Sequence, residues 1–308
     1  FLERHVRPVA SALEHADGDP ERRETGLEMA GALWRFWWVR GYLDEGRGWF
    51  RRLLDRGSPD PTRARAAALH GAGVLANLQG DYDDADRRNG EALEIRRALG
   101  DDHGAAGSLS NLGNTAFDRG DYPAARRRHE ESLALKRARG DLRGAAVSLN
   151  NLGNVAHHEG DHDAARRFHE ESLAIKEALG DAAGIAASLN NLGNVAVGVR
   201  RWDEARERFR QSLEVRRRIG DRHGALVALE SLAHVESRVG DREKGVRLFG
   251  AASRWHVRIG SRHPRMIEEV HRTRLERLRG EMGEAAFAAA WTDGEGLDEA
   301  AALALALG

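Results

Sequence analysis

The sequence has no cysteine and only 6 prolines, although it has 35 glycines in 308 residues. Without cysteine the chain can form no disulfide bond, no thiolate metal site and no cysteine nucleophile. The absence of cysteine also fits a reducing compartment, and we expect a cytoplasmic protein. The glycines are not scattered along the chain, and their spacing is the main source of the predictions that follow.

An excess of one charge and a long apolar run are also missing. The chain has 48 Lys and Arg against 49 Asp and Glu, which argues against a generally basic nucleic-acid binder. We therefore expect no direct contact with nucleic acid. No apolar run reaches the roughly 18 residues that a membrane span requires, and we expect no membrane contact. The chain begins inside a helical pattern without an initiator Met, which favours a piece of a longer protein.

A repeat of 40 residues runs through the chain. The segments 106–145 and 146–185 share 25 identities in 40 positions when they are aligned without gaps. Asn-Leu-Gly-Asn recurs at 111–114, 151–154 and 191–194. Gly-Asp pairs recur at 80–81, 120–121, 160–161 and 240–241, and at 100–101, 140–141, 180–181 and 220–221. Such a period is typical of proteins built from stacked units.

Each unit predicts two helices. Leu149, Leu152 and Val155 follow a helical spacing, Gly160 would end the first helix, and Asp161 would cap the second. A glycine inside the first helix costs about 1 kcal/mol relative to alanine. We therefore expect the second helix to approach the first closely at this glycine. The glycine recurs at 73, 113, 153 and 193.

The units resemble the tetratricopeptide repeat. Leu189, Leu192-Gly193 and Ala196, then the small residue Ala205 and the aromatic Phe209, match its pattern. The period of 40 rather than 34 is similar to that of kinesin-light-chain-like repeats. The resemblance implies an all-α fold, a right-handed α-α superhelical solenoid of helix pairs with a helical C-terminal cap. His129 and His169 replace the usual aromatic residue, and we expect them to pack between helices.

We expect three parts in the chain. Residues 1–65 would hold N-terminal helices, the first over 1–16, and a degenerate first repeat. Residues 66–265 would hold five repeats, and residues 266–308 would hold capping helices. The cap is predicted to contain an Arg-rich helix at 264–280, a short helix at 283–292 and an Ala/Leu helix at 296–307.

Both ends of the chain resemble those of the repeat region in bacterial STAND regulators. Residues 32–46 are similar to its entry, and 247–252 with 283–287 are similar to its close. These regulators are signal-transduction ATPases or transcriptional regulators with an NB-ARC-like nucleotide domain before the repeats. The resemblance implies a non-catalytic module that senses a ligand and controls that upstream domain. A free-standing adaptor remains the alternative, and a metal or small-molecule enzyme is a further one.

Two motifs suggest chemistry that the repeat register argues against. Gly71 to Ala76 matches G-x-G-x-x-A, but a dinucleotide site needs a preceding strand, and Gly73 is expected in mid-helix. The chain has no G-x-x-x-x-G-K-[ST] loop, so we expect it to bind neither ATP nor another cofactor. Residues 157–162 hold three His and two carboxylates, which could bind zinc or nickel. The same segment aligns with the exposed turn 117–122, so a solvated turn is the simpler interpretation.

The resemblance also implies a binding surface, because the first helices of tetratricopeptide repeats line a concave face. Asn offers both a donor and an acceptor, so a ladder of Asn could bind the backbone of a protein or peptide, or a small ligand. Alternatively, these amides bond neighbouring repeats and set their spacing. The positions that match the family's groove are Arg35, Trp38, His70, Val74, Asn77, Asn111, Asn114, Phe117, Asn150, Asn151, Asn154, His157, Asn190, Asn191, Asn194, Val197, Glu230 and His234.

Residues 254–279 carry eight Arg against three Glu, which suggests an acidic or nucleic-acid partner. The apolar residues Ile267, Val270 and Leu278 on the same segment need a packing partner, so a solvated capping helix is the preferred interpretation.

Overall fold

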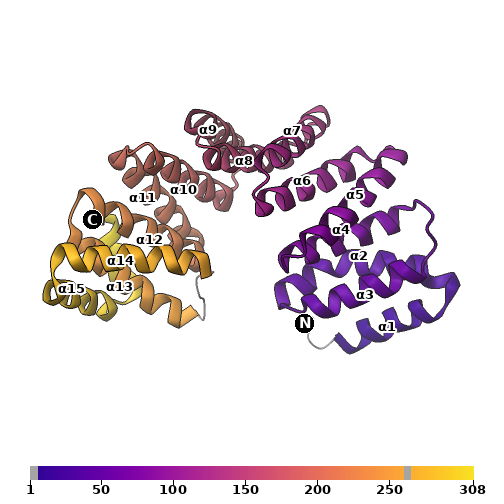
Figure 1. Cartoon of the computed structure of the whole chain (residues 1–308), viewed down its shortest axis with the longest axis horizontal. Coiled ribbons are helices and arrows are strands. Elements are labelled where there is room, and N and C mark those ends of the chain that lie inside the picture. The colour runs from indigo at the N-terminus through magenta and orange to yellow at the C-terminus, as the bar shows by residue number, and fades with distance from the viewer. Residues whose placement is uncertain (1–5, 260–264) are drawn as a thin grey trace. The chain divides into compact units, whose positions relative to one another are not determined.

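The computed structural model describes residues 6–259 and 265–308. Every regular element in this part of the chain is a helix, so the predicted all-α fold of paired helices is confirmed (Figure 1). The chain divides into two compact units, residues 1–159 and residues 160–308, which we call unit 1 and unit 2. The predicted helix over 1–16 begins at Val6 among the described residues, and residues 1–5 and 260–264 lie outside them.

Unit 1 contains three complete helix pairs and the first helix of a fourth. Its elements are α1 (Val6–Gly18), the short 3₁₀ helix η2 (Pro20–Arg22), α2 (Arg23–Arg40), α3 (Leu43–Arg56), α4 (Arg63–Leu78), α5 (Tyr82–Ala98), α6 (Asp102–Arg119), α7 (Tyr122–Ala138) and α8 (Leu142–His158). The pairs are α2 with α3, α4 with α5, and α6 with α7, and the two helices of each pair pack together.

Unit 2 continues with the same kind of helix and ends in the cap. Its elements are α9 (His162–Ala178), α10 (Ala182–Gly198), α11 (Trp202–Ile219), α12 (Arg222–Val239), α13 (Arg242–Ile259), α14 (Arg265–Met282), α15 (Glu284–Gly296) and α16 (Glu299–Leu307). Among the described residues, no helix is both long and apolar enough to cross a membrane.

The Gly-Asp pairs form the turns that the sequence predicts, except that Gly240 has φ of −114° and is not left-handed. Gly80 and Gly120 have φ angles of 76° and 84°, in the left-handed region where a side chain is unfavourable. The carboxylates of Asp81 and Asp121 then accept the backbone N–H three residues on, at 3.3 and 3.0 Å. Arg200 departs from this pattern, because it adopts φ of 59° without being a glycine.

The glycines inside the first helices lie under large side chains of the second helices, as predicted. A Cβ atom at Gly113 would lie 2.6 Å from His129 Cε1, and one at Gly193 would lie 2.5 Å from Phe209 Cε1. His129 and His169 are both buried, so the expectation that histidine occupies the aromatic position is confirmed. This close approach explains why glycine occupies these positions despite its cost in a helix.

The cap differs from the sequence prediction in its two last helices. The helix expected to end at Trp291 continues to Gly296. Its last turn is held against α13, because Gly294 packs directly on the backbone of that helix. A Cβ atom at Gly294 would lie 2.1 Å from the Arg247 carbonyl oxygen. The last helix begins at Glu299 rather than 296, since Asp298 caps it by accepting the backbone N–H of Ala301 at 2.8 Å.

Candidate functional site

The predicted groove residues all lie on first helices. In unit 1, α2 packs on α4, α4 on α6 and α6 on α8, so the residues that these four helices present share one surface, which we call the first-helix face. The face comprises Arg35 and Trp38 on α2, His70, Val74 and Asn77 on α4, Asn111, Asn114 and Phe117 on α6, and Asn150, Asn151, Asn154 and His157 on α8. The remaining predicted residues lie in unit 2, with Asn190, Asn191, Asn194 and Val197 on α10 and Glu230 and His234 on α12.

An aromatic platform stands at the α2 end of the first-helix face. Trp38 is 48% exposed, and its ring stacks on that of Trp34 with centroids 5.9 Å apart. The Arg35 guanidinium lies 5.2 Å from the Trp34 ring, and His70 meets that ring edge-on at 6.0 Å. The exposed ring of Trp38 is thus held in place by neighbours, a favourable arrangement for an interface anchor.

His70 is a neutral hydrogen-bond acceptor at the centre of this surface. Burial, together with the charges of Arg96 and Arg35, lowers the pKa of His70 to about 4. Its Nδ1 lies 3.2 Å from Asn111 Nδ2 and 3.4 Å from Arg96 Nη1. Because both neighbours are donors, Nδ1 accepts, and the ring proton is assigned to Nε2.

Several amides of the first-helix face bridge neighbouring helix pairs. Asn151 Nδ2 donates to Asn114 Oδ1 at 3.1 Å, and Asn77 Nδ2 donates to Asp118 Oδ2 at 2.8 Å. Asn111 Nδ2 also donates to Asn89 Oδ1, at 3.2 Å. These contacts are of the kind expected if the amides bond neighbouring repeats and set their spacing, the alternative considered from the sequence. Asn114 is nevertheless exposed, and its own amide nitrogen donates to no described group.

Three other positions of the first-helix face, Val74, Phe117 and His157, are apolar or aromatic, whereas Asn150 and Asn154 are half-buried amides on α8. Phe117 is half-buried and meets Tyr122 and His158 at centroid distances of 5.6 and 5.0 Å. His157 lies edge-on to His158 at 5.9 Å, and Val74 is half-buried. These residues make an apolar and aromatic border beside the amides.

In unit 2 the predicted positions have unequal surroundings. Asn190 is buried, and its Oδ1 has no partner among the described residues, whereas Asn194 is exposed. Asn191 and Val197 are half-buried on the same helix. Glu230 accepts from His256 Nε2 at 3.0 Å, so this carboxylate is already engaged.

His234 faces the Arg-rich helix α14, which the sequence did not place there. Burial and the charges of Arg274, Arg238 and Arg277 lower the pKa of His234 to about 3. Its ring meets Trp202 edge-on at 6.2 Å. The helix that was expected to be a solvated cap thus brings guanidinium groups to one predicted groove position.

A series of cations on the second helices was not recognised from the sequence. Lys136 Nζ donates to Ser110 Oγ and Ser148 Oγ, both at 2.8 Å, and burial lowers the pKa of Lys136 although Asp141 opposes the shift. Lys176 Nζ donates to Ser188 Oγ at 2.8 Å. The sequence does contain the pattern that would have predicted this series, because a cation or a histidine recurs every 40 residues, at Arg96, Lys136, Lys176, Arg216 and His256.

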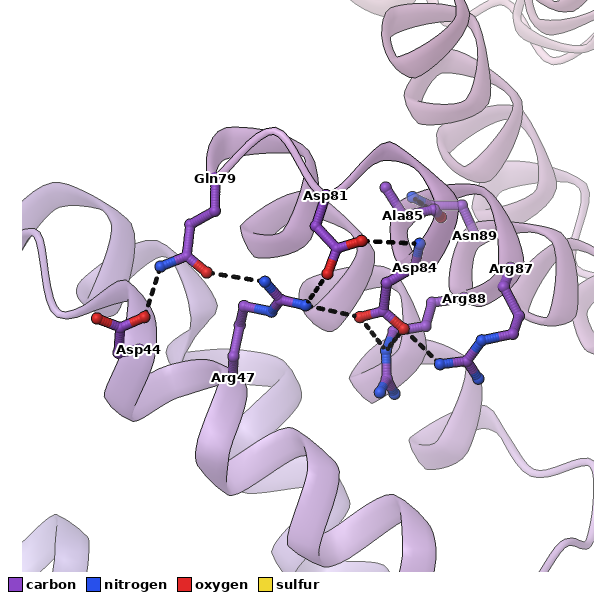
Figure 2. A network of polar contacts seen from close by, with 9 residues as sticks. All are labelled: Asp44, Arg47, Gln79, Asp81, Asp84, Ala85, Arg87, Arg88 and Asn89. Carbon is purple, nitrogen blue, oxygen red and sulfur yellow. Dashed lines mark hydrogen bonds and ion pairs between the residues drawn. The ribbon is translucent and has the colours of Figure 1, made fainter.

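A network of polar contacts joins α3 to α5 (Figure 2). Arg47 donates to Gln79 Oε1 at 2.9 Å, to Asp81 Oδ2 at 2.5 Å and to Asp84 Oδ2 at 3.1 Å. Gln79 Nε2 donates to Asp44 Oδ1 at 2.7 Å. Burial alone would raise the pKa of Asp84, but its bonded and nearby Arg groups outweigh burial and lower that pKa.

The Arg47 position begins a ladder of ion pairs between successive helix pairs. In unit 1 the next ion pair joins Asp86 to Arg119 at 3.2 Å, and here the acidic residue takes the position that Arg47 has in the first pair. The ion pair after it joins Arg126 to Glu159. In unit 2 the corresponding rungs are Arg166 with Glu204 at 2.8 Å and Arg206 with Glu236 at 3.1 Å.

The structure gives no support to a metal centre at the His-rich turn. Among residues 6–259 and 265–308, no group of three or more His, Asp or Glu is arranged to hold a metal ion. In unit 1 His158 instead stacks on Tyr122 with centroids 5.4 Å apart. The G-x-G-x-x-A match lies in the middle of α4, with Gly73 directly under Asn89. A dinucleotide site there is excluded, because the motif follows no strand.

Solved structures with the same fold are numerous. BtubC (BKLC) from P. vanneervenii is 23% identical over 71% of this chain and 92% of its own, with a TM-score of 0.61. The apo form of RapI is 14% identical over 87% of this chain and 96% of its own, with a TM-score of 0.68. At such identities the likeness concerns the fold.

A third structure is a signal-transduction ATPase with numerous domains (STAND) from Pyrococcus horikoshii, which has a tetratricopeptide repeat sensor. It is 14% identical over 91% of this chain and 45% of its own, with a TM-score of 0.68. No curated protein matches the sequence. The tetratricopeptide repeat family model matches residues 64–138, 104–178, 144–218 and 184–254. These overlapping matches cover more than half of the sequence, and the chain therefore belongs to the tetratricopeptide repeat family.

Proposed function

We propose that this tetratricopeptide repeat module is the partner-sensing region of a STAND-type regulator and controls a nucleotide-binding domain encoded before Phe1. The similarity of residues 32–46 and 247–252 to the two ends of such a region supports this context. The fold shared with the STAND protein of Pyrococcus horikoshii supports it as well, since this chain covers 45% of that protein. In this proposal the 308 residues bind a partner and contribute neither a catalytic residue nor a cofactor site.

The first-helix face is the proposed site for a protein or peptide, or a small ligand. The observation that carries this proposal is the exposed ring of Trp38, which Trp34 holds by stacking. A large aromatic side chain that is ordered before binding loses little entropy on binding, which is typical of interface anchors. The amide nitrogen of exposed Asn114 adds a donor that a peptide carbonyl can accept.

The chain would act by switching between partner-bound and partner-free states. In the free state it would hold the upstream domain inactive, and partner binding would release that domain. We also propose that residues 1–65, 66–265 and 266–308 serve as entry, repeat array and cap, in a cytoplasmic protein that contacts neither membrane nor nucleic acid through these residues.

The test requires the complete coding sequence that contains this chain. If it encodes a nucleotide-binding domain, ATP hydrolysis by the full-length protein should increase when residues 1–308 are deleted. A control variant, Arg127→Ala on the exposed side of α7, should leave hydrolysis unchanged. Unchanged hydrolysis after deletion would contradict control by this chain.

A free-standing adaptor is the competing function, and one observation favours it. The matched chains of BtubC and RapI are covered over 92% and 96% of their length, so similar arrays occur as nearly whole chains. A coding sequence without a nucleotide-binding domain would decide for the adaptor, and the first-helix face would keep its proposed binding role.

A further inference from the structure

Helices α3 and α5 of unit 1 border a cavity of about 310 Å³ that is separate from the first-helix face. Its apolar part is formed by Phe50 and Ala72, both buried. Polar side chains from α3, from α5 and from the turn before α5 form the rest. The lining residues are Asp44, Arg47, Gly48, Phe50, Arg51, Ala72, Gln79, Asp84 and Arg88.

The polar network around the cavity engages most of its acceptors (Figure 2), and of the Asp44 carboxylate only Oδ1 is bonded by a described residue. Asp84 receives hydrogen bonds from Arg47, Arg87 and Arg88, so both of its oxygens are occupied. Asp44 Oδ1 accepts from Gln79, whose own Oε1 accepts from Arg47. The unused hydrogen-bonding capacity of the lining is therefore mostly donor capacity.

Arg88 holds most of that unused capacity. The residue is only 9% exposed, and its Nε donates to both carboxylate oxygens of Asp84 at 2.9 Å. Its two terminal nitrogens donate to no group in the described part of the chain, and Figure 2 shows them on the side turned away from Asp84. These nitrogens are accessible from the cavity, where an anion would accept stronger hydrogen bonds from them than water does.

Arg51 adds a second positive charge to the same cavity. It lies one turn beyond Arg47 on α3, is exposed, and makes no hydrogen bond or ion pair with a described residue. Because Asp84 is shared by three arginines, the charge of Arg51 is not balanced within the network. The unpaired charge of Arg51 and the two unbonded terminal nitrogens of Arg88 thus favour an anionic occupant.

Gly48 leaves one wall of the cavity without a side chain. A Cβ atom at Gly48 would meet nothing within 4 Å, whereas one at Gly46 would lie 2.7 Å from Leu75 Cδ1. Packing therefore explains Gly46 but not Gly48, although glycine is unfavourable in a helix interior. The bare backbone at Gly48 lets a ligand approach α3 closely.

We propose that this cavity binds a small carboxylate or phosphate anion, which the terminal nitrogens of Arg88 hold through two parallel hydrogen bonds. A planar guanidinium fits two oxygens of such an anion, and Arg51 supplies the second charge. Asp84 is a positioning residue, because its bond to Arg88 Nε fixes the plane of the guanidinium. The site is independent of the partner proposed for the first-helix face.

The test titrates the 308-residue chain with inorganic phosphate and, in a second series, with succinate, at constant ionic strength set with chloride. Calorimetry should show saturable binding at one site per chain for at least one anion, and the better of the two identifies the ligand class. Arg88→Gln and Gly48→Leu should each weaken that binding about tenfold or more. Gly48→Leu keeps every charge and fills the open wall.

The matched control is Arg128→Gln, which removes the same charge at the position 40 residues on, where the arginine is exposed. It should bind like the wild type. Gly48→Leu should melt no lower than the wild type, because leucine favours the helix and meets no neighbour. Absence of saturation with both anions would overturn the proposal. Equal affinity in wild type, Arg88→Gln and Gly48→Leu would overturn it as well.

Discussion

The turn between α10 and α11 is a built-in weak point of unit 2. At Gly80, Gly100, Gly120, Gly140, Gly160, Gly180 and Gly220 a glycine adopts the left-handed conformation and an aspartate follows it, but Arg200 and Arg201 occupy these positions here. Arg200 has φ of 59°, and Arg201 makes no side-chain cap bond. Replacement of both by Gly and Asp should therefore stabilise the turn.

The expected gain follows from the two separate contributions. A left-handed residue other than glycine costs roughly 1–2 kcal/mol, and the added freedom of glycine in the unfolded chain takes back about 0.4–1 kcal/mol. Asp at the cap adds roughly 0.5–2 kcal/mol. The Arg201–Glu204 pair that is lost, at 3.7 Å and exposed, contributes less than about 1 kcal/mol. The net prediction is about 1–2 kcal/mol in favour of the double variant.

Native-state hydrogen exchange measures this locally, because the hydrogen-bonded amides that close the turn, those of residues 201 and 205, report its opening. Their exchange should slow about 5- to 30-fold in Arg200→Gly/Arg201→Asp. The reverse change in unit 1, Gly120→Arg with Asp121→Arg, should accelerate exchange at the start of α7 by a similar factor. If neither turn responds, the conformational argument is wrong.

Three further predictions concern packing, protonation and charge. Gly113→Leu should destabilise unit 1 by a few kcal/mol in a denaturant melt, because its Cβ would clash with His129, whereas Gly90→Leu, with open space around it, should not. Burial and the charge of nearby Lys136 lower the pKa of His129 to about 4. Between pH 6.5 and 4 the unfolded chain therefore binds a proton that the folded chain does not. The free energy of unfolding should decrease as the pH falls through this range. NMR titration of the ring and melts across this range check this prediction. Asp86→Arg should destabilise the α5–α6 contact by up to about 1 kcal/mol, and adding Arg119→Glu should restore it in a double-mutant cycle.

The repeated part of the fold could be predicted because each turn and each helix contact recurs at the same register. Gly120 and Asp121 form the turn as expected, and His129 fills the slot over Gly113. These features depend on residues that are close in sequence or one repeat apart. The cap could not be predicted as well, because the end of α15 depends on backbone contact between Gly294 and Arg247, which no periodic pattern encodes.

The candidate sites, too, could be predicted from the sequence only in part. The amide positions followed from the repeat register, but whether an amide such as Asn151 bonds a neighbour or stays open depends on side-chain geometry. The anion cavity was not foreseen, because it joins Arg88 to the degenerate first pair, where Gly48 has no equivalent in the regular repeats. Long-range contacts also hold the last helix, since Arg210 donates to the Leu307 carbonyl at 2.5 Å.

The central claim is that the first-helix face binds a protein or peptide partner, and affinity for selected peptides tests it most directly. Peptides selected from a random library on the immobilised chain would be measured against the wild type, Trp38→Ala, Asn114→Ala and the control Arg127→Ala. The account predicts at least about tenfold weaker binding for Trp38→Ala and several-fold weaker binding for Asn114→Ala, with the control unchanged. Unchanged affinity in both face variants, with their folding intact by circular dichroism, would contradict the account.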